Sequence, residues 1–145
     1  MTSLALAYQD AGWGVSGSDT PESYITDDIL SVRGINIVSP LTAPIPADSA
    51  LVIYSGAYDQ PETASRTLTL AAALAEFVDR RRVIAVAGVG GKTTTSAMLA
   101  ALFHGLGRDV GYYVGTGSIG GLPAPGHAGT DPIYIVEADE YAISK

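Results

Sequence analysis

Residues 82–97, RVIAVAGVGGKTTTSA, decide how the rest of this chain is interpreted. The apolar run 83–87 is typical of a buried strand, a glycine-rich turn follows at 88–91, and the segment from Lys92 to about Leu106 predicts a helix. Unpaired N–H groups at a helix N-terminus point at an anion, glycines let the main chain approach it closely, and a lysine adds positive charge. The stretch therefore predicts a phosphate-binding loop.

This loop is a short form of the common pattern. The usual first glycine would stand five residues before the last one, and Val86 occupies that place, which leaves Gly88-x-x-Gly91-Lys92-Thr93. We expect Lys92 to contact the β- and γ-phosphates of ATP and the Thr93 hydroxyl to face Mg²⁺. An exposed glycine turn is the alternative, but the helix dipole disfavours a lysine at a helix start without an anion. The residues expected to bind the nucleotide are Gly88, Val89, Gly90, Gly91, Lys92, Thr93 and Thr94.

A second candidate feature follows the apolar run 133–136, which is typical of a buried strand. Glu137, Asp139 and Glu140 come directly after it. Ligands bind at the carboxyl ends of strands in open parallel sheets, and Mg²⁺ prefers a few carboxylates together with phosphate oxygens. A solvated acidic turn is the alternative interpretation. The position after a buried strand, downstream of the phosphate loop, favours a metal role for one carboxylate.

The residues before the loop alternate between predicted strands and helices, the rhythm of a nucleotide-binding α/β fold. We expect helices at 3–11, from Pro21 to Gly34 with a cap at Asp19 or Thr20, at Pro61 and at 71–80. Strands are expected near Val15 and at 35–38, 50–54 and 67–70, and after the loop at 110–114, followed by a long glycine-rich loop over 115–131. The pattern begins in a helix, so we expect the opening strand and glycine turn of such a domain to be missing.

Ser18 and Asp19 follow the first of these strands, where such folds contact a ribose or base. Asp19 could serve equally as a helix cap. His104 and His127 are isolated in the sequence, and neither has neighbours that indicate a metal site.

Composition excludes several classes of protein. The chain has 145 residues, is 47% hydrophobic and carries a formal charge of −7, which argues against a nucleic-acid surface. There is no cysteine, so disulfides and thiolate metal sites are excluded. No apolar run approaches the roughly 20 residues that span a bilayer, and the first residues do not resemble a signal peptide. We expect a cytoplasmic protein with no membrane or nucleic-acid partner.

Three segments resemble the Mur ligase family of peptidoglycan synthesis. AVAGVGGKTTTSAM at 85–98 resembles its ATP-binding segment, VEADEY at 136–141 its magnesium-binding strand end, and AYQDAGWGVSGSD at 7–19 the UDP-binding domain. The similarity runs in the same order along the chain. It is nearest to the two branches that act on UDP-N-acetylmuramate, which add L-alanine or a recycled murein peptide. Gly90 stands where these branches usually have histidine, and Ala142 where they have aspartate.

The resemblance implies an ATP-dependent amide-bond ligase that works through an acyl phosphate. Residues 1–80 would form an incomplete Rossmann-like UDP-binding domain, and residues 81–145 the first part of a P-loop ATP-binding domain with a parallel sheet. It further implies that Lys92 and Glu137 serve catalysis, that Thr93 and Glu137 hold Mg²⁺, and that Ser18, Asp19 and Ser55 lie near the UDP group. We expect the chain to be a piece of a ligase that is inactive alone.

Two other hypotheses remain open at this point. The chain could be a nucleotide-binding module without ligase activity, or it could derive from another amide ligase with the same short loop, such as a folylpolyglutamate synthetase relative. The Ser-Gly-Ser-Asp stretch at 16–19 favours the UDP-dependent family over the latter.

Overall fold

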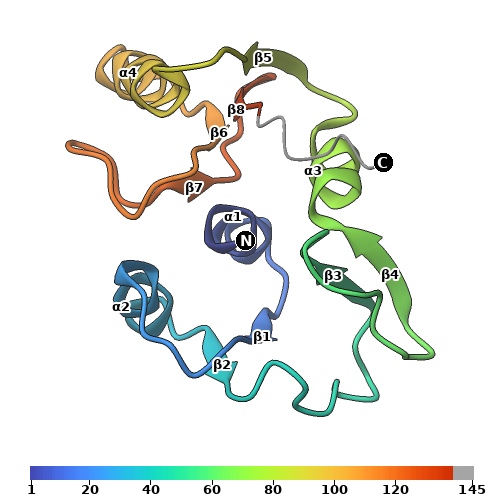
Figure 1. The fold of residues 1–145 in the computed structure, drawn as a ribbon. Coiled ribbons are helices and arrows are strands. Elements are labelled where there is room, and N and C mark those ends of the chain that lie inside the picture. The colour runs from blue at the N-terminus through green and yellow to red at the C-terminus, as the bar shows by residue number, and fades with distance from the viewer. Residues whose placement is uncertain (139–145) are drawn as a thin grey trace.

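The computed structural model describes residues 1–138, and Asp139, Glu140 and Ala142 lie outside the described part. Figure 1 shows how helices and strands alternate along the chain. The helices are α1 (Thr2–Asp10), α2 (Ile25–Val32), α3 (Leu70–Val78) and α4 (Lys92–Gly105). The strands are β1 (Ser16–Ser18), β2 (Asn36–Val38), β3 (Leu51–Tyr54), β4 (Arg66–Thr69), β5 (Arg82–Val86), β6 (Gly111–Tyr113), β7 (Gly126–His127) and β8 (Ile133–Glu137).

The strands form two parallel pairs and one larger sheet, so the predicted α/β class is confirmed. β1 pairs with β2 and β3 pairs with β4, while the four-stranded sheet has the order β5-β8-β6-β7. β8 runs parallel to both β5 and β6, whereas β7 is antiparallel to β6. The central place of β8 puts its carboxyl end beside that of β5, where the phosphate loop begins.

Helices cover both faces of the larger sheet. Successive side chains of β8 point to opposite faces, so each face packs against a different helix. Ile135 packs with Ala100 of α4, whereas Tyr134 and Val136 pack with Val78 of α3. Tyr134 and Ile135 are fully buried. This three-layer arrangement explains the unbroken apolar run of β8, which is typical of strands buried on both faces.

Helix α2 begins later than the sequence predicts. Its N-cap is Tyr24, whose N–H donates to the side chain of Asp27 at 2.8 Å in a capping box. Asp19 therefore does not cap the helix, and its carboxylate accepts the N–H of Thr20 instead. Ile25 and Val32 of this helix are 78% and 87% exposed. The helix ends before Gly34, as predicted, and Gly34 itself has a positive φ of 69°.

Two further sequence predictions were wrong in detail. The helix expected at Pro61 does not form, because the Thr63 hydroxyl accepts the N–H of Ser65 in a local turn that competes with helical bonding. The loop predicted over 115–131 contains the short strand β7. A Cβ at Gly126 of β7 would collide with the backbone carbonyl of Ser3. Only glycine lets β7 lie this close to α1.

Helix α1 joins the two halves of the chain. It lies at the centre of Figure 1, between β7 and the β1–β2 pair, and its buried face carries Leu4, Leu6 and Ala7. Leu6 packs with Leu30 from α2 and with Ala124 from the glycine-rich loop. The hydroxyl of Ser3 donates to the carbonyl of Val114 at 2.6 Å.

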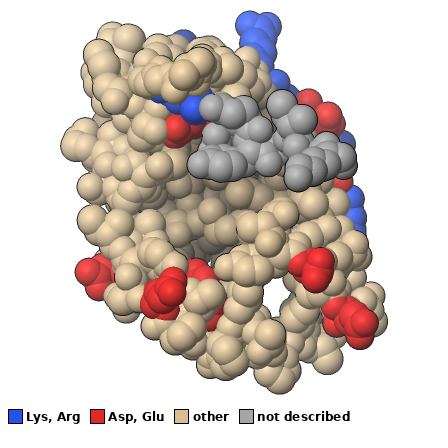
Figure 2. All heavy atoms as spheres, viewed as in Figure 1, with Lys and Arg blue, Asp and Glu red and all other residues tan. Residues whose placement is uncertain are grey.

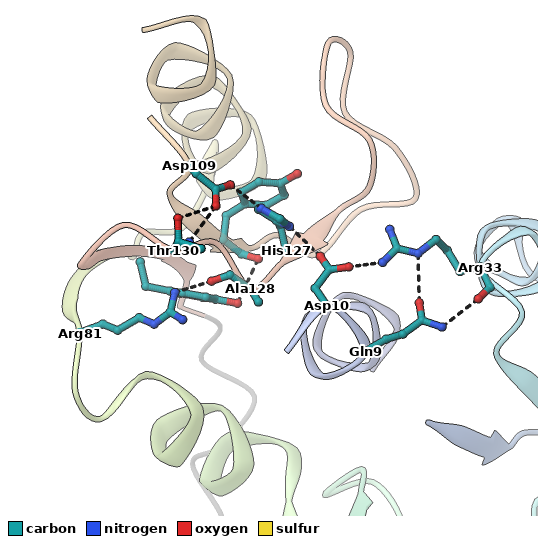
Figure 3. A network of polar contacts seen from close by, with 10 residues as sticks. Gln9, Asp10, Arg33, Arg81, Asp109, His127, Ala128 and Thr130 are labelled. Atoms are coloured by element: carbon teal, nitrogen blue, oxygen red, sulfur yellow. Dashed lines mark hydrogen bonds and ion pairs between the residues drawn. The ribbon is translucent and has the colours of Figure 1, made fainter. Parts of the chain in front are cut away.

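A polar network reinforces this contact (Figure 3). His127 lies between two carboxylates, with Nδ1 at 2.6 Å from Asp10 and Nε2 at 2.7 Å from Asp109. Asp10 also binds the guanidinium of Arg33, and Asp109 accepts bonds from the N–H and hydroxyl of Thr130. Burial alone would lower the pKa of His127, but the hydrogen bonds and charges of Asp109 and Asp10 outweigh it and raise the pKa.

This raised pKa predicts a pH-dependent stability. The folded chain holds the His127 proton more tightly than the unfolded chain, so the stabilisation is fully present below the unfolded value of about 6.5. It is lost as the pH rises through the folded pKa. We expect the free energy of unfolding, measured by urea titration, to fall over this range, and His127→Asn to remove that fall. The same pH slope in the variant would contradict the assignment, with His104→Asn, an exposed histidine of α4, as the matched control.

The surface reflects the acidic composition of the chain. On the face in Figure 2, acidic side chains gather over the lower half and basic ones toward the upper right. None of the helices in the described part is long and apolar enough to cross a membrane.

Candidate functional site

The phosphate-type loop links the edge strand β5 to helix α4. Gly91 is the N-cap of α4 and has a left-handed φ of 76°, while Gly88 has a φ of 148°. Both are conformations that side chains rarely adopt, so glycine is required at both positions. Val89 stands at the exposed tip of the loop. The Lys92 ammonium folds back over the loop and donates to the carbonyl of Gly88 at 3.0 Å.

The loop has room for a ligand. Residues 88–91 are exposed, and a Cβ at Gly90 or Gly91 would meet nothing within 4 Å. The space at Gly90 also means that a larger side chain fits there. The first N–H groups of α4 have no partner within the helix, since helical bonding begins with Thr95 N–H to Gly91 at 2.9 Å. The loop thus offers N–H groups and one ammonium to an anion.

Glu137 of the central strand β8 forms a hydrogen bond with Thr93, which lies just after the glycine loop. It is the last residue of β8 and only 9% exposed. One carboxylate oxygen accepts the Thr93 hydroxyl at 2.5 Å, and the other accepts the Gly115 N–H at 2.6 Å. A Cβ at Gly115 would lie 3.2 Å from the second oxygen. The two residues predicted to hold Mg²⁺ are therefore in direct contact, although they lie on different elements.

Thr93 and Glu137 fit the Mg²⁺ ion and the nucleotide phosphates that the sequence predicts. A buried carboxylate and a hydroxyl supply the hard oxygen donors that Mg²⁺ prefers, and phosphate oxygens and water complete such sites. The described residues contain no group of three or more acidic, histidine or cysteine side chains that could hold a metal without such help. Glu137 and Thr93 suit an ion that arrives with a nucleotide. They do not form a site made of protein ligands alone.

The residues predicted to lie near UDP are arranged more loosely. Ser18 is the last residue of β1, and Ser55 directly follows β3. The Ser18 hydroxyl donates to the carbonyl of Leu41 at 3.0 Å. Ser55 accepts the N–H of Ala57 at 3.3 Å. Asp19 lines a cleft of about 550 Å³ between the start of α2 and β2. Neither serine is among the described residues that line this cleft.

Sequence reasoning missed two residues of functional interest. The Gly115 N–H donates to Glu137. The available signal was its position directly after the strand predicted at 110–114, because the carboxyl ends of neighbouring parallel strands meet at one edge of the sheet. His127 has two carboxylate partners that no local pattern reveals, since they come from distant segments. His104 is exposed on α4.

Comparisons with known proteins agree on one family. No protein-family model matches the chain. The bifunctional enzyme MurC/Ddl of Chlamydia pneumoniae is 35% identical over 151 residues, which covers 97% of this chain and 18% of that protein. A UDP-N-acetylmuramate–L-alanine ligase of Bifidobacterium longum is also 35% identical, over 97% of this chain and 29% of its own length. The chain thus spans less than a third of these two relatives.

Solved structures show the same relationship. The murein peptide ligase of Psychrobacter arcticus superposes with a TM-score of 0.76 at 28% identity, over 97% of this chain and 35% of that one. The ligase MPL from Neisseria meningitides has a TM-score of 0.79 at 22% identity, over 97% of this chain and 49% of its own, which shows a shared fold. By sequence and by fold, the chain belongs to the Mur ligase family and corresponds to a part of its longer members.

Proposed function

We propose that the chain supplies the nucleotide-binding part of an ATP-dependent ligase that joins L-alanine or a recycled peptide to UDP-N-acetylmuramate. The observation that carries this proposal is the contact between Thr93 and Glu137 beside the glycine loop. The relatives named above are ligases with such substrates, which supports the same chemistry for a protein that contains this chain. A cytoplasmic location accords with nucleotide substrates of this kind.

In this proposal each loop residue has a defined task. The N–H groups of residues 88–94 bind the β- and γ-phosphates, and the Lys92 ammonium leaves the Gly88 carbonyl to pair with phosphate oxygens. Thr93 and Glu137 hold Mg²⁺. The ion would neutralise charge that builds up on the transferred phosphoryl group. The Gly115 N–H fixes the orientation of the Glu137 carboxylate so that its other oxygen faces the loop.

The reaction that this site would serve has two steps. A carboxylate oxygen of the muramoyl group attacks the γ-phosphorus of ATP, which forms an acyl phosphate and releases ADP. The amine nitrogen then attacks the acyl carbon, phosphate leaves, and the nitrogen loses a proton to give the amide. The chain's own contribution is to the first step, because Lys92 and the loop N–H groups stabilise charge on the transferred phosphoryl group.

We further propose that residues 1–80 form the UDP-binding unit and residues 81–145 the start of the ATP-binding unit. Ser18, Asp19 and Ser55 would contact the UDP group from the ends of β1 and β3. The cleft beside Asp19 supports this assignment for Asp19. For the two serines, the support is their position at the carboxyl ends of parallel strands.

Replacement of Lys92 by alanine tests the phosphate loop. We expect Lys92→Ala to weaken ATP binding in the presence of Mg²⁺ by about tenfold to a hundredfold, since hydrogen bonds to charged groups contribute about 1.5–3 kcal/mol. Titration calorimetry measures this directly. Arg80→Ala, which removes an exposed positive charge elsewhere, serves as the control. Equal ATP affinity for wild type and Lys92→Ala would remove the phosphate-loop assignment.

A further inference from the structure

The serine in the first turn of α1 forms a hydrogen bond far from its own helix. A serine at a helix start commonly caps the helix or bonds to nearby backbone groups. The hydroxyl of Ser3 instead donates to the carbonyl of Val114 at 2.6 Å, across 111 residues of sequence. Ser3 is 5% exposed and Val114 is fully buried, so water does not compete for this bond. A buried bond to so distant a partner indicates a task outside the helix.

The carbonyl of Val114 and the N–H of Gly115 belong to one peptide group. Its C=O accepts the Ser3 hydroxyl, and its N–H donates to a carboxylate oxygen of Glu137 at 2.6 Å. Because the peptide is planar and rigid, a bond that orients its C=O also orients its N–H. A bond accepted at the C=O further polarises the N–H, which makes it a stronger donor in a buried site. The Ser3 hydroxyl and the Glu137 carboxylate are therefore linked through a single peptide.

A second donor bonds to the same carbonyl. The N–H of Thr116 donates to the carbonyl of Val114 at 3.0 Å, and a carbonyl oxygen has two lone pairs. Loss of the Ser3 hydroxyl would leave this carbonyl bonded to Thr116, so no buried acceptor would be without a partner. The chain should therefore stay folded without the hydroxyl. The peptide between Val114 and Gly115 would nevertheless lose one of the two bonds that orient its C=O.

The packing of α1 fixes the place of the Ser3 hydroxyl. A Cβ at Gly126 of β7 would collide with the backbone of Ser3, which shows how closely the helix approaches this strand. Leu4, the next residue of the helix, is buried. Figure 1 shows α1 beside β7. A group that is locked by packing in this way can hold the geometry of a functional site.

We propose that Ser3 is a positioning residue for the metal-binding carboxylate: its hydroxyl holds the peptide between residues 114 and 115 so that the Gly115 N–H keeps Glu137 turned toward Thr93. This inference rests on the proposed function, in which Glu137 and Thr93 hold the Mg²⁺ that arrives with ATP. Replacing a group that orients a metal ligand typically costs about 10–100-fold in metal affinity. Ser3 acts through one more bond, so we expect an effect of about threefold to tenfold. The N-terminal half of the chain thus helps to set the geometry of the ATP site.

Calorimetric titration of the whole chain with ATP, once with Mg²⁺ and once with EDTA, tests this inference. Ser3→Ala should weaken ATP binding with Mg²⁺ about threefold to tenfold and leave binding in EDTA unchanged. Ser3→Cys keeps the size of the side chain but is a weak donor, so it should bind like Ser3→Ala. Thr2→Ala, which removes a half-buried hydroxyl one residue earlier, is the matched control and should bind like wild type. An equal loss with and without Mg²⁺, or wild-type binding by Ser3→Cys, would show that Ser3 has only a packing role and would overturn the inference.

The amide proton of Gly115 in the ligand-free chain provides a second measurement, which does not depend on ATP binding. A weaker hydrogen bond deshields an amide proton less. In NMR spectra of the ¹⁵N-labelled chain, Ser3→Ala should therefore move the Gly115 amide proton upfield, while Thr2→Ala should leave it in place. An unchanged Gly115 signal in Ser3→Ala would refute the link between Ser3 and Glu137. If wild type bound no ATP but the signal still moved, the failure would lie with the proposed function and the link would stand.

Discussion

Glu137→Gln is expected to remove the magnesium dependence of ATP binding while the chain stays folded. Glutamine keeps the shape of the side chain, and its amide oxygen can still accept the N–H of Gly115. The Thr93 hydroxyl can rotate to accept from the new NH₂ group, so both local contacts survive. Only the negative charge is lost, and a divalent cation beside phosphates needs that charge.

The expected size of this effect follows from charged interactions. A bond to a charged group contributes about 1.5–3 kcal/mol, which corresponds to a loss of about tenfold to a hundredfold in Mg²⁺-dependent ATP affinity. Calorimetric titration with and without EDTA measures it. Glu76→Gln, the same change at a surface ion pair with Arg66, should leave ATP affinity unchanged. If the response of Glu137→Gln to Mg²⁺ equalled that of wild type, the carboxylate would not be a metal ligand.

Gly126→Ala is expected to destabilise the chain more than any exposed substitution. The added Cβ would meet the backbone carbonyl and Cα of Ser3, so either α1 or β7 must move. Overpacking of this kind costs about 1–3 kcal/mol and occasionally more. Because α1 contacts β7 and β6 and also packs Leu6 against Leu30 of α2, the strain would spread to both halves. Urea unfolding monitored by circular dichroism measures the loss.

Gly120→Ala is the matched control for this substitution. Gly120 lies in the same glycine-rich segment, but a Cβ there would meet nothing within 4 Å. Its replacement should change the free energy of unfolding by less than about 0.5 kcal/mol. A Gly126→Ala chain as stable as the Gly120→Ala chain would show that α1 does not pack against β7 as described.

The sequence predicts the elements around the phosphate loop well, because local patterns determine them. The apolar run of β5, the glycines and the lysine specify a strand, a turn and a helix start within one short segment. β8 is recognisable in the same way, since burial on both faces requires an unbroken apolar run. The contact between Thr93 and Glu137 then follows from the rule that parallel strands end at one edge.

The features that could not be predicted depend on distant or competing contacts. β7 is a two-residue strand whose only signal is a glycine, and that glycine is needed because of Ser3 at the other end of the chain. The sequence predicts that α2 starts at Pro21, because Asp19 or Thr20 could cap it there, but the capping box of Tyr24 and Asp27 prevails. His127 finds Asp10 only when α1 docks on β7.

The most direct test of the proposed nucleotide site is to map where ATP binds. The amide signals of a ¹⁵N-labelled chain would be followed in NMR spectra as ATP and Mg²⁺ are added, and again after addition of EDTA. We predict the largest shifts at Gly90, Gly91, Thr93 and Gly115, with a reduced response of Gly115 once the metal is removed, because Glu137 connects it to the ion. Saturable shifts confined to other parts of the chain, or no shifts at all, would contradict the account.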